Sequence, residues 1–203
     1  MEAGTARMRL EEGNARFVSG TSLNMAAGYH SRRIELVAGQ EPFAAVLSCS
    51  DSRVPPEIVF DQGLGDLFVI RVAGNIVTPP EIGSVEFAAK VLGTRLVVVM
   101  GHTFCGAVGA AVDALTRGAE APSPNLGSIV EMITPQVRPL LSEPGDNDGE
   151  RLVAEAVRAN VRSSVRRLNE NSSLLERLVA EDGLAIVGAE YSIETGVVEF
   201  LYL

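Results

Sequence analysis

Residues 95–106 read RLVVVMGHTFCG, an apolar run that ends in a histidine and a cysteine. Residues 43–53 read FAAVLSCSDSR, a second apolar run followed by the chain's other cysteine. Short continuous apolar runs are typical of strands that are buried on both faces of a parallel sheet. Because the carboxyl ends of neighbouring parallel strands meet at one edge of the sheet, we expect both cysteines, Asp51 and His102 to lie close together.

The remainder of the chain alternates between strand and helix patterns. Further strands are predicted over residues 67–72, 184–191 and 197–203, the last two as an antiparallel pair. Apolar spacing, with proline at helix starts and glycine at stops, predicts helices over residues 8–18, 55–60, 79–92, 104–117, 127–141, 149–168 and 172–181. This alternation predicts an α/β fold in which helices flank a mainly parallel sheet that has an antiparallel C-terminal edge strand.

The charge of the chain disfavours several classes of partner. A net charge of −9 and a pI near 4.8 oppose binding to nucleic-acid phosphates and to anionic membrane surfaces, which require a basic face. No apolar run approaches the roughly 20 residues that span a bilayer, and the first residues carry charges in place of a signal-peptide core. We therefore expect a cytoplasmic protein with no nucleic-acid and no membrane partner, whose two cysteines are thiols used for metal binding or catalysis.

Thiolates and histidine nitrogen are preferred ligands of zinc, and a catalytic site keeps a fourth position for water or substrate. Cys49, His102 and Cys105 provide three such ligands and predict a Zn2+ site, with the fourth position left to water or to Asp51. Cys49, Asp51 and Arg53 stand at every second position, so in an extended segment their side chains project to the same side. Arg53 can then pair with the Asp51 carboxylate and keep the fourth metal position open. Taken singly, each cysteine is also compatible with an inert core thiol, and the histidine with a hydrogen-bonded core residue.

The length of 203 residues, of which 46% are hydrophobic, suits one domain with a sizeable core. We treat residues 1–203 as a single domain. It divides into an N-terminal helical arm over residues 1–40 and a zinc-binding α/β core over residues 41–203.

The two motifs CSDSR and GHTFCG carry a resemblance to a known family. They resemble the paired motifs of the β-class carbonic anhydrases, in particular bacterial members with a plant-like active site. The similarity covers roughly Glu11 to Ala111. It implies that both cysteines and His102 bind a catalytic zinc ion, and that Asp51 and Arg53 form the catalytic dyad.

The resemblance also implies the residues of the substrate pocket. Gln40 stands nine residues before the first cysteine, where the plant-like subgroup has a glutamine, and Phe68 and Gly106 match other pocket positions. Phe87 stands where the subgroup often has a tyrosine, so one hydroxyl contact to the substrate is missing. Ala107 replaces the second of a glycine pair. The chain has no tryptophan, which argues against the inhibition by bicarbonate that another subgroup shows.

The activity that the resemblance implies is reversible hydration of carbon dioxide to bicarbonate and a proton by zinc-bound hydroxide. It further implies a homodimer or a tetramer, with the N-terminal helix packed on a neighbouring copy and the pocket near the interface. Hydrolysis of carbonyl sulfide or carbon disulfide on the same framework stays open as an alternative. So do a non-catalytic structural zinc site and a cysteine-dependent enzyme with His102 as base.

Overall fold

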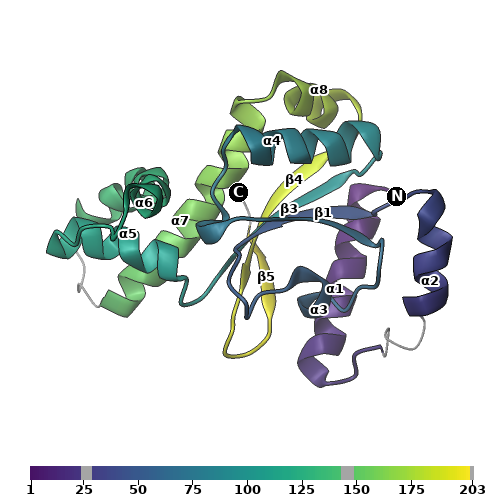
Figure 1. The fold of residues 1–203 in the computed structure, drawn as a ribbon, viewed down its shortest axis with the longest axis horizontal. Helices are drawn as coiled ribbons and strands as arrows, with labels where there is room; N and C mark the ends of the chain where they lie inside the picture. The colour runs from purple at the N-terminus through teal and green to yellow at the C-terminus, as the bar shows by residue number, and fades with distance from the viewer. Residues whose placement is uncertain (24–28, 143–148, 202–203) are drawn as a thin grey trace.

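The computed structural model describes residues 1–23, 29–142 and 149–201, and it places five strands in one sheet with helices on both faces (Figure 1). The strands are β1 (Ala44–Ser48), β2 (Leu67–Arg71), β3 (Leu96–His102), β4 (Ala185–Tyr191) and β5 (Val198–Leu201). Their order is β2-β1-β3-β4-β5, and β5 alone pairs antiparallel to its neighbour. The predicted fold class is therefore confirmed, although the last two residues of the predicted final strand lie outside the described residues.

Helices occupy most of the remaining described residues. The α-helices are α1 (Ala3–Ser19), α2 (Tyr29–Glu35), α3 (Pro56–Val59), α4 (Pro79–Glu86), α5 (Gly106–Arg117), α6 (Pro124–Val137), α7 (Gly149–Glu170) and α8 (Ser173–Glu181). Short 3-10 or π segments are η2 (Leu36–Ala38), η3 (Ala73–Asn75), η4 (Phe87–Val91) and η5 (Arg138–Ser142). Helix α6 begins three residues earlier than predicted, because the Ser123 side chain accepts a hydrogen bond from the Leu126 amide and caps it.

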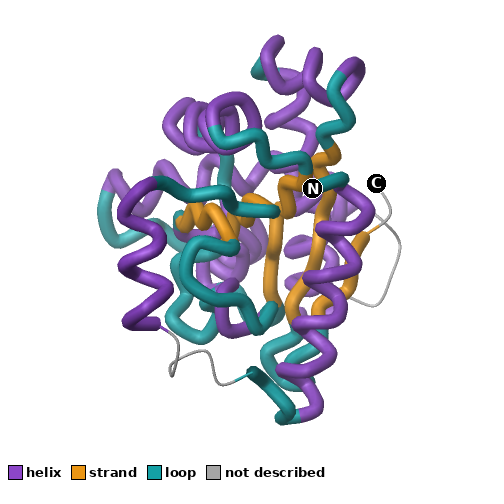
Figure 2. Tube along the Cα trace, turned by 90° about the vertical axis from the view of Figure 1, so that its right-hand side faces the viewer, coloured by secondary structure: helices purple, strands orange, loops and turns teal. Residues whose placement is uncertain are grey.

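The two faces of the sheet bury separate groups of side chains. On one face α1 packs on the strands, and its Ala6 and Leu10 are fully buried beside Val46 and Met100. Figure 2 shows α1 running alongside the strands. The opposite face is covered by α4, α7 and α8, which contribute the buried side chains Val85, Val161, Val165, Leu168, Leu175 and Leu178. The apolar stripe of α7 therefore packs in the core of the chain.

The N-terminal helix has its own chain as a packing surface. Because Ala6 and Leu10 lie in the core of the same chain, α1 needs no neighbouring copy to bury its apolar side. Met8 and Val18 on the same helix remain about half exposed, and a contact with a neighbour through them stays a prediction. In the part of the chain that the structure describes, no helix combines the length and the apolar character needed to cross a membrane.

Strands β1 and β3 lie side by side and parallel, with Ser48 opposite Met100. The loops that follow them therefore leave the sheet at the same edge. Cys49 follows β1 directly, and His102 is the last residue of β3. The sheet topology alone thus brings the two sequence motifs together.

Candidate metal centre

The structure brings the three predicted metal ligands into one cluster. The ligand atoms of Cys49, His102 and Cys105 all lie within 4.8 Å of one another. Their residues are 5%, 0% and 2% exposed, so water reaches the cluster poorly. The burial strengthens electrostatic interactions between these groups and any cation they hold.

A tight turn at the end of β3 brings two of these ligands to the same point. Phe104 adopts φ 57°, in the left-handed region that a residue with a Cβ enters at a cost of about 1–2 kcal/mol. Cys105 returns to extended backbone and occupies the N-cap position of α5. The helix therefore begins at Gly106 and not at Phe104 as the sequence pattern predicted, and His102 and Cys105 meet across the turn.

His102 has one nitrogen ready to bind a metal. Its Nδ1 lies 2.9 Å from the carbonyl oxygen of Thr103, so this nitrogen carries the proton and donates. Nε2 is then a bare acceptor, and it is buried without a hydrogen-bond partner among the described residues. Such an orphaned buried nitrogen beside two sulfur atoms fits a soft or borderline cation such as zinc.

The two thiols of the cluster share a proton. The pKa of Cys49 is lowered to about 4, mainly by the hydrogen bond from the Cys105 side chain and further by the Gly74 amide. The same contact with Cys49, together with burial, raises the pKa of Cys105. The first proton therefore leaves the pair easily, and the second is retained until a cation replaces it.

Asp51 and Arg53 form the predicted bidentate pair. The Arg53 Nε lies 3.0 Å from Asp51 Oδ1 and its Nη2 lies 2.8 Å from Oδ2, while the Arg53 amide also donates to Oδ1 at 2.9 Å. These bonds, with the side chain of Arg53 as the largest cause, hold the pKa of Asp51 well below its usual range. The Oδ2 atom lies 4.0 Å from His102 Nε2, so an ionised carboxylate stands directly beside the cluster.

Three residues that sequence reasoning missed hold the two motifs in place. Arg71, at the end of β2, donates from Nε to the Cys49 carbonyl at 3.0 Å and from Nη2 to the Asp51 carbonyl at 2.6 Å. The Gly74 amide donates to Cys49 Sγ at 3.3 Å, and Thr103 orients His102. Arg71 ends β2, the strand adjacent to β1, and Gly74 follows it, so their place at the same sheet edge was the available signal.

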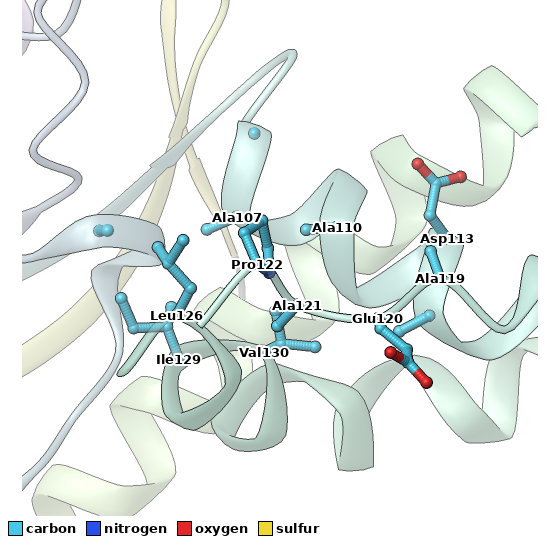
Figure 3. A pocket seen from close by; sticks show the side chains of 13 residues that line it. Ala107, Ala110, Asp113, Ala119, Glu120, Ala121, Pro122, Leu126, Ile129 and Val130 are labelled. Atoms are coloured by element: carbon cyan, nitrogen blue, oxygen red, sulfur yellow. The ribbon is translucent and has the colours of Figure 1, made fainter. Parts of the chain in front are cut away.

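An apolar cavity of about 360 Å³ lies between α5 and α6 (Figure 3), and Gly106, the residue after Cys105, is among those that line it. Its other lining residues are mostly small or aliphatic: Ala73, Ala107, Ala110, Asp113, Ala114, Ala119, Glu120, Ala121, Pro122, Leu126, Ile129 and Val130. In Figure 3 the carboxylates of Asp113 and Glu120 point away from the aliphatic side chains. The interior therefore suits an uncharged molecule better than an ion.

The other predicted pocket residues are not brought to the cluster within one chain. Gln40 is exposed and precedes β1 at the end opposite Cys49. Phe68 pairs in register with Ala45, four residues before Cys49, or about 13 Å along the strand. Its ring packs against that of Phe87 at a centroid distance of 6.0 Å, and Phe87 is 45% exposed. Their role in the pocket stays a prediction.

The sequence matches known proteins along most of its length. The profile of the family described as carbonic anhydrase matches residues 44–198. The chain is 43% identical over 190 residues to a carbonic anhydrase of Mycolicibacterium smegmatis, which covers 94% of this chain and 89% of the relative. It is 42% identical over 187 residues to carbonic anhydrase 2 of Mycobacterium tuberculosis, with 92% of this chain and 87% of the relative covered.

The fold has matches among solved structures as well. One is a structure from a study of two tetrameric β-carbonic anhydrases of the filamentous ascomycete Sordaria macrospora. It has a TM-score of 0.76 and 26% sequence identity, and the match covers 89% of this chain and 93% of that one. From the family profile, these relatives and the shared fold, the chain belongs to the β-carbonic anhydrases, a family of enzymes.

Proposed function

We propose that this enzyme carries out the zinc-dependent, reversible hydration of carbon dioxide to bicarbonate and a proton. The observation that carries the proposal is the buried Cys49, His102 and Cys105 cluster, with the Asp51 carboxylate 4.0 Å from the free nitrogen of the histidine. Cys49, His102 and Cys105 would hold the zinc ion. Bound there, zinc would supply the Lewis acidity that brings the pKa of a water molecule to near neutrality.

Asp51 and Arg53 act on the attacking oxygen and on access to the metal. Arg53 donates to both carboxylate oxygens of Asp51, which keeps the side chain from turning fully toward the three ligands. The remaining lone pairs of the ionised carboxylate accept a hydrogen bond from the O–H group of water or bicarbonate. An acceptor at this position selects an oxygen that carries a proton and orients its free lone pair toward carbon dioxide.

We infer that Gln40, Phe68 and Phe87 complete the substrate pocket of a second copy of the chain. All three lie away from the ligands of their own chain, and the exposed Phe87 ring forms an apolar surface that a partner can cover. The structural relative from Sordaria macrospora is one of two tetrameric enzymes, which supports an assembly here. The assembly proposed for this chain is a homodimer or a tetramer.

The cytoplasm is the proposed compartment. Cys49 and Cys105 are both free and buried, and zinc binding requires them as thiolates. A reducing compartment preserves that state. Fractionation of cells that carry the native gene would place the protein with cytoplasmic markers, and recovery with membranes or culture medium would overturn the assignment.

The direct test of the function offers two gases to the same preparation. Stopped-flow assays with carbon dioxide and with carbonyl sulfide, on protein of measured zinc content, are expected to give hydration of carbon dioxide as the faster reaction. Turnover of carbonyl sulfide with negligible hydration would replace the proposed substrate. Zinc-loaded protein inert toward both gases would favour a structural metal site.

A further inference from the structure

Helix α7 presents two buried polar side chains to the end of the sheet that holds the metal centre. Asn160 and Ser164 are each 2% exposed and lie one helical turn apart. Buried polar groups are costly unless they are hydrogen-bonded. Asn160 Nδ2 donates to the Gly74 carbonyl at 2.7 Å, and Ser164 Oγ donates to the Asn75 carbonyl at 2.9 Å. Both bonds end on two successive residues of η3.

The η3 turn is a conformation that its neighbours must hold. Gly74 has φ 71° and Asn75 has φ 42°, so two successive residues adopt left-handed backbone. For Asn75, which has a Cβ, that conformation costs on the order of 1–2 kcal/mol. On the other side of the turn, a Cβ on Gly74 would lie 2.8 Å from Ile133 and 3.0 Å from Ala107. The turn is therefore fixed between α7 and the helices α5 and α6.

Close packing of α7 on β3 makes these contacts attainable. A Cβ added to Gly101, the residue before His102, would lie 2.6 Å from Val161 Cγ2 and 3.1 Å from Val157 Cγ1. The glycine thus allows α7 to approach the strand at the level of the metal ligands. Figure 1 shows α7 running from beside α5 up to α8 along the sheet.

The fixed turn directs one N–H group at a metal ligand. The Gly74 amide donates to Cys49 Sγ at 3.3 Å. This N–H belongs to the peptide plane just before the two planes that α7 holds by their carbonyls, so the backbone angles of Gly74 link its direction to them. A hydrogen bond to a thiolate withdraws charge from the sulfur. Partners of this kind orient metal ligands and tune the metal that they hold.

We propose that Asn160 and Ser164 are positioning residues that keep the Gly74 amide on the Cys49 sulfur and so set the charge of this thiolate and its affinity for the metal. The inference rests on the proposed role of Cys49 as a metal ligand. Neither residue is a member of the cluster or lines the apolar cavity, and both act through the turn.

The test uses cobalt, because Co2+ bound to thiolate gives a sulfur-to-metal charge-transfer absorption band. Ser164→Ala removes a single hydroxyl, and Ser164→Thr keeps one. Ser163→Ala is the matched control, since Ser163 is also buried on α7 but makes no hydrogen bond to η3 within the described chain. We expect Ser164→Ala to move the band to longer wavelength and to lower zinc affinity by about tenfold in chelator competition. The threonine variant and the control should match the wild type.

Asn160→Ala is expected to shift the band in the same direction and to weaken zinc binding by up to about 100-fold. If that variant does not fold, Ser164→Ala still decides the matter. A native band and native affinity in Ser164→Ala would overturn the proposal, and so would an equal disturbance in Ser164→Thr. A wild-type protein with no charge-transfer band would instead remove Cys49 as a ligand, and loss of carbon dioxide hydration alone would affect only the proposed function.

Discussion

The edge of the sheet around Cys49 and the aromatic patch of Phe68 and Phe87 differ in how complete they are within one chain. At the sheet edge, the ligand atoms are buried within 4.8 Å of one another, and the carboxylate of Asp51 is held beside them by Arg53. The aromatic patch is partly exposed and contributes no ligand atom to that cluster in the described chain. The contrast supports the proposal that the metal ligands and the Asp51–Arg53 pair come from one chain, while a second copy completes the substrate pocket.

Removal of a metal ligand should have the largest effect, because it disrupts the cluster around Cys49, which is complete within one chain. His102→Ala is expected to leave purified protein almost free of zinc. Hydration of carbon dioxide should fall by more than about 100-fold, a larger loss than follows when a residue that only supports a metal ligand is replaced. The matched control is His30→Ala, which alters the chain's other histidine, an exposed residue of α2. Zinc analysis, hydration rates and circular dichroism are measured together. Full zinc content in folded His102→Ala would exclude this histidine as a ligand.

Asp51→Asn tests the carboxylate without changing the ligands. The amide keeps the shape of the side chain but loses charge and one acceptor, so we expect normal zinc content and a turnover lower by about 10²–10⁴-fold. Glu155→Gln serves as control because Glu155 pairs with Arg151 in an exposed ion pair on α7. Zinc loss in Asp51→Asn with full turnover per remaining metal would refute the role given to Asp51.

The cluster around Cys49, which is complete within one chain, was the part of the site that the sequence could predict. Cys49, His102 and Asp51 follow apolar runs, and strand ends of a parallel sheet meet at one edge, so their proximity follows from topology. The support from Asn160 and Ser164 was not predicted, because polar residues in an apolar helix stripe do not reveal which carbonyls they will bond. Their presence in that stripe was nevertheless a signal that buried partners exist.

The aromatic patch of Phe68 and Phe87, which is incomplete within one chain, was harder to predict for a physical reason. A sequence pattern gives the order of elements in one chain but not the surfaces that copies of the chain present to each other. Gln40 and Phe68 match pocket positions by resemblance, yet the structure places them away from the ligands of their own chain. The turn at Phe104 was also missed, since no propensity favours left-handed backbone at a phenylalanine.

Mixing two inactive variants separates the two regions directly. Asp51→Asn damages the metal side of a site, and Gln40→Ala damages the proposed pocket side. If the sides come from different copies, half of the interfaces in a randomly reassembled equal mixture are mixed, and each of these contains one intact site. About one quarter of wild-type activity should then return after joint unfolding and refolding.

Each variant refolded alone is the control for that mixture, and both should stay at their own low rates. Activity in the mixture equal to the mean of the two parents would place Gln40 in the site of its own chain or outside any site. Sedimentation of the same samples is expected to give dimers or larger species. Monomers at micromolar concentration would contradict the shared pocket.

The smallest expected effect concerns pH. It separates the pH dependence of the hydration rate from the pH dependence of stability at the cluster around Cys49. Two thiolate ligands donate more charge than neutral imidazoles, so hydration is expected to rise from pH 6 toward pH 9. In the folded protein the pKa of Asp51 is depressed, mainly by Arg53. The ionised carboxylate therefore stabilises the fold fully above its unfolded pKa of about 3.9. This stabilisation is lost only as the pH falls through the lower pKa of the folded state. The Tm difference between wild type and Asp51→Asn should therefore stay constant from pH 9 to pH 6 while the rate falls. If that difference shrank in step with the rate, titration of Asp51 would have to explain the loss, and the carboxylate would not be the permanently ionised acceptor that its contacts with Arg53 require.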